Sequence, residues 1–265
     1  MLRPGDEFAG YIVERTVGRG GSATVYLAHR DSDTFALKVL DAADRTQDAL
    51  ERMRREFAIA KSLSHPHIVA VADHGPTWLS MQYVDGGNAT AVETLSDKLV
   101  VLNQIADALD YAHSNGVVHC DVKPANILVN KDFTCGGAVL VDFGVAHLAG
   151  EPPPPLAARP HHVKASLPYA APELLAGEPQ TPATDEYEFA CTTVELITGA
   201  TPFRARTPIG LIDAHLHHPP PRVSRNISWV PRAFDSILAK AMAKRPERRY
   251  QTCTEFAGLV SRVLT

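Results

Sequence analysis

The sequence has few cysteines and no long apolar run. Its 265 residues include only four cysteines, which lie far apart and form no C-x-x-C pair. This spacing disfavours a disulfide framework and a zinc site. No stretch approaches the roughly 20 apolar residues of a membrane span, and the N-terminus lacks the apolar region of a signal peptide. We therefore expect a reduced, cytoplasmic domain without a membrane span.

An excess of positive charge is also absent. The chain has 26 Lys and Arg against 30 Asp and Glu, a formal net charge of −4 at pH 7. Such a chain offers no basic field to nucleic acid, and no dense Lys/Arg run suggests a membrane-surface patch. We expect no nucleic-acid partner. The hydrophobic content of 45% is enough for the core of one large domain or of two lobes that share a cleft.

The most informative segment is 118–128, which carries an acid, a cation and a carboxamide at fixed offsets. Asp121 is suited to orient a substrate hydroxyl and to take its proton. Lys123 falls on the same side of an extended loop and can neutralise charge on a transferred phosphoryl group. The carbonyl oxygen of Asn126 is a hard ligand suited to Mg²⁺, and Asp142, after an apolar run, is a second metal-ligand candidate.

Asp142 is followed by Phe143 and Gly144, and together these motifs resemble those of the protein-kinase family. The family's catalytic loop reads H-R-D-x-K-P-x-N and its metal motif reads D-F-G. The resemblance implies an α+β, bilobal protein-kinase fold. It places a mostly β, nucleotide-binding N-lobe with one helix at 1–84. A mostly α C-lobe with the catalytic loop, the activation segment and the substrate-binding surface follows at 85–265.

A glycine-rich hairpin between two predicted strands resembles the phosphate-covering loop of the family, whose pattern is G-x-G-x-x-G-x-V. Gly18, Gly20 and Val25 match that pattern, while Ala23 replaces the third glycine. Small residues let backbone N–H groups approach phosphates. An ordinary tight turn is the alternative, since a glycine-rich hairpin alone is weakly specific. We expect a stiffer loop that still covers nucleotide.

A lysine lies within the apolar strand predicted at 34–40, and a buried cation needs a partner. This lysine is Lys38, and the amphipathic helix predicted at 47–63 supplies Glu56 near its apolar face. In the family the strand lysine binds the α- and β-phosphates and pairs with a helix glutamate. The resemblance therefore assigns catalytic roles to both residues. There are two alternatives. Glu56 forms only ion pairs on the helix surface, or Glu51 is the partner of Lys38 instead.

Two further strands, predicted at 68–73 and 78–84, lead to the segment that joins the lobes in the family. By resemblance, Met81 takes the gatekeeper position and the backbone of 82–84 meets adenine. Each apolar residue here, taken singly, also fits plain strand core. The nucleotide-binding residues that the resemblance implies are Val17, Gly18, Gly20, Ala23, Val25, Ala36, Lys38, Met81, Tyr83, Val84 and Leu128.

Beyond a helix predicted at 95–115, the segment 165–173 resembles the peptide-binding motif G-T-x-x-Y-x-A-P-E of the family. Ser166 stands for the threonine that contacts the catalytic Asp and Lys. The resemblance also implies that Asp185, just before a helix predicted at 187–198, bonds to the backbone of the catalytic loop. It further implies that Arg249 pairs with Glu173. These last two roles are structural.

The chain departs from the family in two places that serve one mechanism. Cys120 replaces the arginine that precedes the catalytic Asp, and 145–165 contain no Ser, Thr or Tyr. In kinases switched by loop phosphorylation, a phosphate in this loop forms charge-assisted bonds to basic residues, including that arginine. We therefore expect a non-RD kinase that activation-loop phosphorylation does not switch.

The resemblance is to the eukaryotic-like Ser/Thr kinases of actinobacteria, many of which are membrane receptors. It implies transfer of the ATP γ-phosphate to protein Ser/Thr hydroxyls with Mg²⁺, or alternatively Mn²⁺. ATP and protein substrates are then the partners, a homodimer is open, and the full-length protein is compatible with the cell membrane. A nucleotide-binding pseudokinase scaffold is the alternative, favoured by Cys120 and Ala23. A small-molecule phosphotransferase, and an oxidation-sensing Cys120, are further alternatives.

Overall fold

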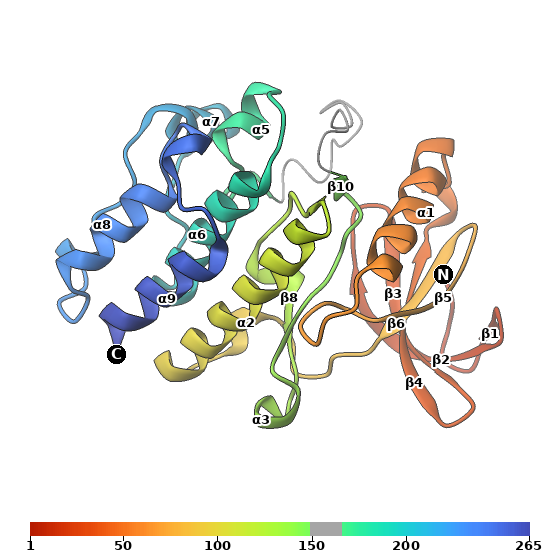
Figure 1. The fold of residues 1–265 in the computed structure, drawn as a ribbon. Helices are drawn as coiled ribbons and strands as arrows, with labels where there is room; N and C mark the ends of the chain where they lie inside the picture. The colour runs from red at the N-terminus through yellow and green to blue at the C-terminus, as the bar shows by residue number, and fades with distance from the viewer. Residues whose placement is uncertain (149–165) are drawn as a thin grey trace.

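The computed structural model describes residues 1–148 and 166–265, with a sheet in the N-terminal part and helices in the remainder (Figure 1). The sheet has six strands in the order β1-β2-β3-β4-β6-β5, and every neighbouring pair is antiparallel. The fold is the bilobal α+β protein-kinase fold that the sequence predicts. The strands are β1 (Glu7–Phe8), β2 (Tyr11–Arg19), β3 (Ala23–Arg30), β4 (Asp33–Leu40), β5 (Val71–Gly75) and β6 (Trp78–Gln82).

The sheet buries side chains on both faces. Helix α1 (Gln47–Ser62) contacts β5 and β6, and Thr46 caps its first turn by accepting a hydrogen bond from the Ala49 N–H at 3.3 Å. A separate core of this half contains Tyr11, whose ring meets that of Trp78 edge to face at 5.7 Å between centroids. The Tyr11 hydroxyl is hydrogen-bonded to Ser80 Oγ at 2.7 Å.

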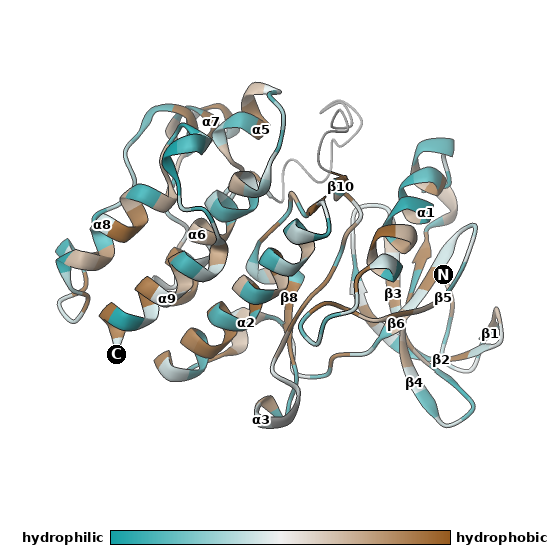
Figure 2. Ribbon diagram, viewed as in Figure 1, coloured by the Kyte–Doolittle hydropathy of each residue, from teal (hydrophilic) through white to brown (hydrophobic). Residues whose placement is uncertain are grey.

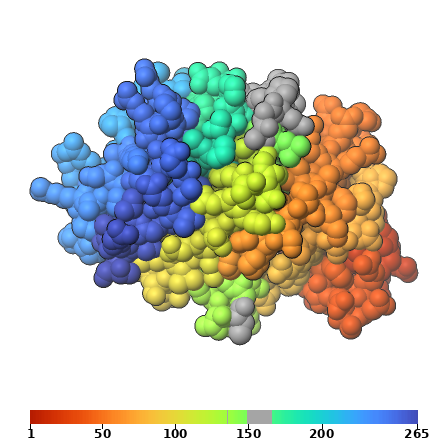
Figure 3. All heavy atoms as spheres, viewed as in Figure 1, coloured from red at the N-terminus to blue at the C-terminus, as the bar shows by residue number. Residues whose placement is uncertain are grey.

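The helical half is built around the long helices α2 and α6, and α2 packs along α9. Hydrophilic and hydrophobic residues alternate along α2 and α9 (Figure 2), as expected for helices with one face in a core. The two halves are in continuous contact on the face shown in Figure 3. The helices are α2 (Leu95–Ser114), α3 (Phe133–Gly136), α5 (Pro172–Ala176), α6 (Pro182–Thr198), α7 (Pro208–His217), α8 (Arg232–Ala241) and α9 (Cys253–Leu264).

Two pairs of short strands hold the catalytic region between the halves. β7 (Val117–Val118) pairs with β10 (His147–Leu148), and β8 (Ile127–Val129) pairs with β9 (Ala138–Leu140). In the described ranges, no helix combines the length and the apolar character that crossing a membrane requires.

Several predicted boundaries differ from the structure, and the two largest shifts have a physical reason. The strand predicted from residue 68 begins at Val71, because residues 68 and 69 pair with Leu140 of β9 instead. The strand predicted to reach residue 84 ends at Gln82. The helix predicted from residue 187 begins at Pro182, where a capping box between Thr181 and Thr184 starts it.

Candidate active site

A cleft of about 810 Å³ is bounded by the glycine-rich turn, β4, α1, the segment after β6 and the catalytic region. Every residue that the sequence predicts to bind nucleotide lines this cleft, and so do Glu56, Asn126 and Asp142. Asp121 and Lys123 lie outside its lining. The cleft also contains residues that the sequence reasoning did not select, including Arg52, Met53, Asn88 and Val141.

The glycine-rich turn joins β2 to β3 and is closed by a hydrogen bond from the Gly20 N–H to the Ala23 carbonyl at 2.8 Å. Ala23, which replaces the third glycine, is only 5% exposed and packs with Leu40, Ala49 and Met53. Its methyl group therefore adds an apolar contact at the start of β3, where a glycine would leave none.

Lys38 joins two acids that are far apart in the sequence. Its Nζ donates to Glu56 Oε1 at 2.7 Å and to Asp142 Oδ1 at 3.0 Å. Burial alone would lower the pKa of Lys38, but the carboxylates of Asp142 and Glu56 outweigh it and raise that pKa, so the ammonium stays charged. Glu56 is 5% exposed, which excludes the alternative of a surface pair. Glu51 bonds to Gln47 on the exposed side of α1.

The side chains of the catalytic loop converge on Asp121. Lys123 Nζ donates to Asp121 Oδ2 at 2.7 Å and to Ser166 Oγ at 2.9 Å, and the Ser166 hydroxyl donates to Asp121 Oδ1. Asn126 Nδ2 donates to Asp121 Oδ2 at 2.9 Å. The predicted contact of Ser166 with both Asp121 and Lys123 is thus confirmed. The arrangement gives a carboxylate, a cation and a hydroxyl within hydrogen-bond reach of one another.

Helix α6 fixes the backbone of this loop, as predicted for Asp185. The Asp185 carboxylate accepts hydrogen bonds from the N–H groups of His119 at 2.8 Å and Cys120 at 2.7 Å. It also accepts one from His113 Nε2 at 2.7 Å. Although burial opposes ionisation, the bond to His113 prevails and lowers the pKa of Asp185. Cys120 is held at φ 60° and Asp142 at φ 67°, a region that non-glycine residues rarely adopt.

Cys120 is buried against a histidine that the sequence reasoning did not select. Its Sγ lies 3.6 Å from His147 Nδ1, and the thiol is packed with Val118 and Val145. Cys120 is 3% exposed, which agrees with a packing role more than with that of an oxidation sensor. Most of the hydroxyl-free segment 145–165, from residue 149 onward, lies outside the described residues.

The predicted pair between Glu173 and Arg249 is present and bidentate. Arg249 Nη1 donates to Glu173 Oε1 at 2.7 Å and Nη2 donates to Oε2 at 2.8 Å, with both side chains almost fully buried. Thr184 also donates to Glu173. This pair joins α5 to the segment before α9.

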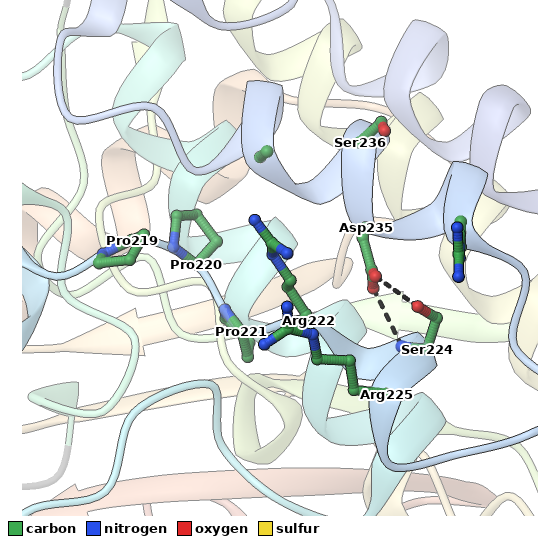
Figure 4. A pocket seen from close by; sticks show the side chains of 10 residues that line it. Pro219, Pro220, Pro221, Arg222, Ser224, Arg225, Asp235 and Ser236 are labelled. Atoms are coloured by element: carbon green, nitrogen blue, oxygen red, sulfur yellow. Dashed lines mark hydrogen bonds between the residues drawn. The ribbon is translucent and has the colours of Figure 1, made fainter.

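A second hollow of about 750 Å³ lies between the segment 219–225 and α8 (Figure 4). Arg222 and Arg225 lie beside its three prolines, and Asp235 accepts hydrogen bonds from the Ser224 N–H and hydroxyl at 3.0 and 2.5 Å. It contains none of the site residues predicted from the sequence.

The donor set of the cleft suits a hard divalent cation. Asp142 contributes a carboxylate, and Asn126 uses its Nδ2 toward Asp121, which leaves its carbonyl oxygen as the atom suited to a metal. Both line the same cleft as Lys38. Among the residues that the structure describes, no histidine or cysteine lines the cleft, so the ligands it offers are oxygen atoms.

Comparison with known proteins agrees with this geometry. The family model for the protein kinase domain matches residues 11–257. Serine/threonine-protein kinase PknJ of Mycobacterium tuberculosis is 41% identical over 99% of this chain and 47% of its own length. PknF of the same species is 38% identical over 97% of this chain and 56% of its own length. The chain thus spans about half the length of these curated relatives.

The missing arginine before Asp121 also suggests a kinase such as mycobacterial PknI. The crystal structure of the M. tuberculosis PknI kinase domain matches with a TM-score of 0.76 and 33% identity, over 99% of this chain and 98% of that one. Sequence, fold and site geometry lead to one conclusion. The chain belongs to the protein kinase family, and it is similar to the Pkn-type Ser/Thr kinases of mycobacteria.

Proposed function

We propose that this chain is the catalytic domain of a protein kinase that transfers the ATP γ-phosphate to Ser/Thr hydroxyls of proteins. The observation that carries the proposal is Lys38, which bridges Glu56 and Asp142 inside the cleft. In kinases the ion pair between this lysine and the helix glutamate must be in place for phosphoryl transfer, together with the binding of Mg²⁺ by the aspartate of the D-F-G motif. We also propose that the N-lobe ends at residue 84 and that the C-lobe begins at residue 85.

In this mechanism Asp121 accepts the proton of the substrate hydroxyl, and the Lys123 ammonium beside it stabilises negative charge on the transferred group. Lys38 binds the α- and β-phosphates while Glu56 orients it. The bound adenine lies between the apolar residues of the cleft, against the backbone that follows Met81. Asn126 and Asp142 would hold Mg²⁺, or Mn²⁺, which when bound neutralises charge on the phosphates.

We further propose that this kinase is non-RD and that activation-loop phosphorylation does not switch it. In a phospho-switched kinase, a loop phosphate offsets the charge of an arginine before the catalytic Asp. Here that position holds the uncharged thiol of Cys120, and β10 already pairs with β7 beside it. Phosphatase treatment of the purified chain should leave its turnover unchanged, and a large loss would contradict this part.

The kinase function is tested by following radiolabel from ATP and Mg²⁺ to a generic basic protein and to the chain itself. Asp121→Asn should lower kcat by on the order of 10²- to 10⁴-fold, because proton abstraction contributes about that much. ATP affinity, measured by calorimetry, should change little. Asp107→Asn on the exposed side of α2 is the matched control and should transfer label like the wild type.

A nucleotide-binding scaffold without catalysis stays the competing proposal. It gains support if the wild type binds ATP but transfers no label to either acceptor. Transfer to a small alcohol and to no protein would instead favour a small-molecule phosphotransferase. For the full-length protein, we propose ATP and protein substrates as partners. A homodimer and a location at the cell membrane are both compatible with the resemblance to kinases that are membrane receptors.

A further inference from the structure

Side chains, rather than a backbone ladder, bind the N–H groups around Asp121. The N–H groups of His119 and Cys120 donate hydrogen bonds to the Asp185 carboxylate. The Asp121 N–H donates to Nδ1 of the His119 ring at 3.3 Å. The next N–H, that of Val122, goes to Glu188 Oε2 at 2.8 Å. The loop conformation is thus imposed by the groups that surround it.

Glu188 shares this task with Thr192, one turn farther along α6. The Thr192 hydroxyl donates to the Val122 carbonyl at 3.0 Å, while Glu188 accepts from the Val122 N–H. Residues four apart lie on one face of a helix. The two side chains therefore bond the N–H and the carbonyl of Val122, and α6 orients the peptide groups on both sides of this residue.

Glu188 differs from Asp185 in its electrostatic environment. It is 2% exposed, and no ion pair joins it to a cation within the described parts of the chain. The groups that face it are Asp185, Asp121, Glu173 and the Cys191 thiol. Burial, followed by the like charges of Asp185 and Asp121, raises the pKa of Glu188 well above its usual range.

We propose that Glu188 is a positioning residue for phosphoryl transfer, which acts on Asp121 through the peptide group of Val122. The inference rests on the proposed kinase function. The Glu188 carboxyl oxygen accepts the Val122 N–H at 2.8 Å, and this bond holds the peptide group that directly follows Asp121. If the carboxyl group is replaced by an apolar one, the Val122 N–H loses its partner inside a dry site, and the loop shifts to find another.

The test compares Glu188→Leu, which removes the acceptor, with Glu188→Gln, whose carbonyl oxygen accepts the same bond without charge. A misplacement of about 1 Å near the chemistry can lower turnover by roughly 10²-fold. We therefore expect Glu188→Leu to lower kcat by about 10- to 100-fold at unchanged ATP affinity, and Glu188→Gln to restore most of the rate. Thr192→Val should lower kcat by a smaller factor.

Thr193→Val is the matched control on the same helix, because the Thr193 hydroxyl bonds within α6, to the Phe189 carbonyl at 2.9 Å. It should leave kcat unchanged. Equal losses in Glu188→Gln and Glu188→Leu would overturn the proposal, as would wild-type turnover in Glu188→Leu. If Glu188→Leu fails to fold, Thr192→Val decides, and wild-type turnover in that variant overturns the proposal.

Hydrogen exchange of the Val122 amide separates this inference from the kinase function itself. Exchange should accelerate in Glu188→Leu and stay slow in Glu188→Gln, whether or not the chain transfers phosphate. If the wild type transfers no label, the kinase function fails, and the exchange rates still show whether Glu188 holds the loop. Unchanged exchange in Glu188→Leu would overturn the positioning role.

Discussion

Cys120 is the residue directly before Asp121, and its Sγ lies 3.6 Å from Nδ1 of His147. The strand pair β7–β10 brings the two together, since His147 is opposite Val118. A small, uncharged side chain therefore fills the position at which phospho-switched relatives of the family carry an arginine. The surroundings are adapted to the thiol: Val118 and Val145 complete an apolar cluster around it.

Restoring the arginine should destabilise the chain. Cys120→Arg would bury a cation among apolar groups, and an uncompensated buried charge costs about 3–5 kcal/mol. We expect a drop of this size in the free energy of unfolding, measured by urea denaturation. Cys120→Ala, which changes volume but not charge, is the control and should cost less. A Cys120→Arg protein as stable as the wild type would show that the cluster accommodates charge.

Lys38→Met should weaken ATP binding while leaving the cleft walls in place. Hydrogen bonds to charged groups contribute about 1.5–3 kcal/mol, which corresponds to roughly 10- to 100-fold in affinity. Calorimetric titration with ATP and Mg²⁺ measures the effect. Lys61→Met, on the exposed end of α1, is the control and should bind like the wild type. Equal affinity of Lys38→Met and wild type would remove Lys38 from the nucleotide site.

Glu186 makes stability depend on pH. Burial raises its pKa to about 8 from 4.5, so the folded state binds an extra proton between these values. Stability must then fall as pH rises from about 4.5 to 8, where the unfolded chain releases the proton and the folded chain retains it. Glu186→Gln keeps an oxygen for the Tyr250 N–H, which Glu186 binds at 2.8 Å, and removes this dependence.

We expect Glu186→Gln to be about 1–4 kcal/mol more stable than the wild type at pH 8.5, with the gain shrinking toward pH 4.5. Urea denaturation at several pH values measures the difference. Glu247→Gln, on an exposed residue, is the control and should show no such gain. A gain that is constant across the pH range would show that ionisation of Glu186 is not its source.

Arg249→Met should be strongly destabilising, because it leaves Glu173 buried without its cation. Breaking a buried pair from one side costs about 3–5 kcal/mol, whereas replacing both partners by apolar groups is often close to neutral. The double variant Arg249→Met with Glu173→Leu should therefore be more stable than Arg249→Met alone. Thermal denaturation measures both, and a double variant less stable than the single one would contradict the account.

Much of the site could be predicted because its residues occur at fixed offsets within single segments. Asp121, Lys123 and Asn126 come from one short loop, and the sequence alone indicated their chemistry. The contacts of Asp185 and the Glu173–Arg249 pair were predicted from family resemblance, and the structure contains both.

What could not be predicted depends on contacts between distant segments. β5 begins late because residue 69 bonds to Leu140, which no local pattern indicates. His147 and Glu188 gave no signal of their own in the sequence. One is a single histidine among alanines and aliphatic residues, and the other is a glutamate that a helix pattern would leave on the surface. Only the packing of α6 against the loop shows that Glu188 is buried.

Because α6 supplies the bonds to the backbone of His119, Cys120 and Val122, we expect the catalytic loop to become ordered only when that helix is in place. We expect this order to be acquired when the C-lobe core closes around α6. During refolding, catalytic competence should return together with burial of the C-lobe core, even if the N-terminal sheet has formed earlier. We therefore expect assembly of the C-lobe core and assembly of the active site to occur as one kinetic event.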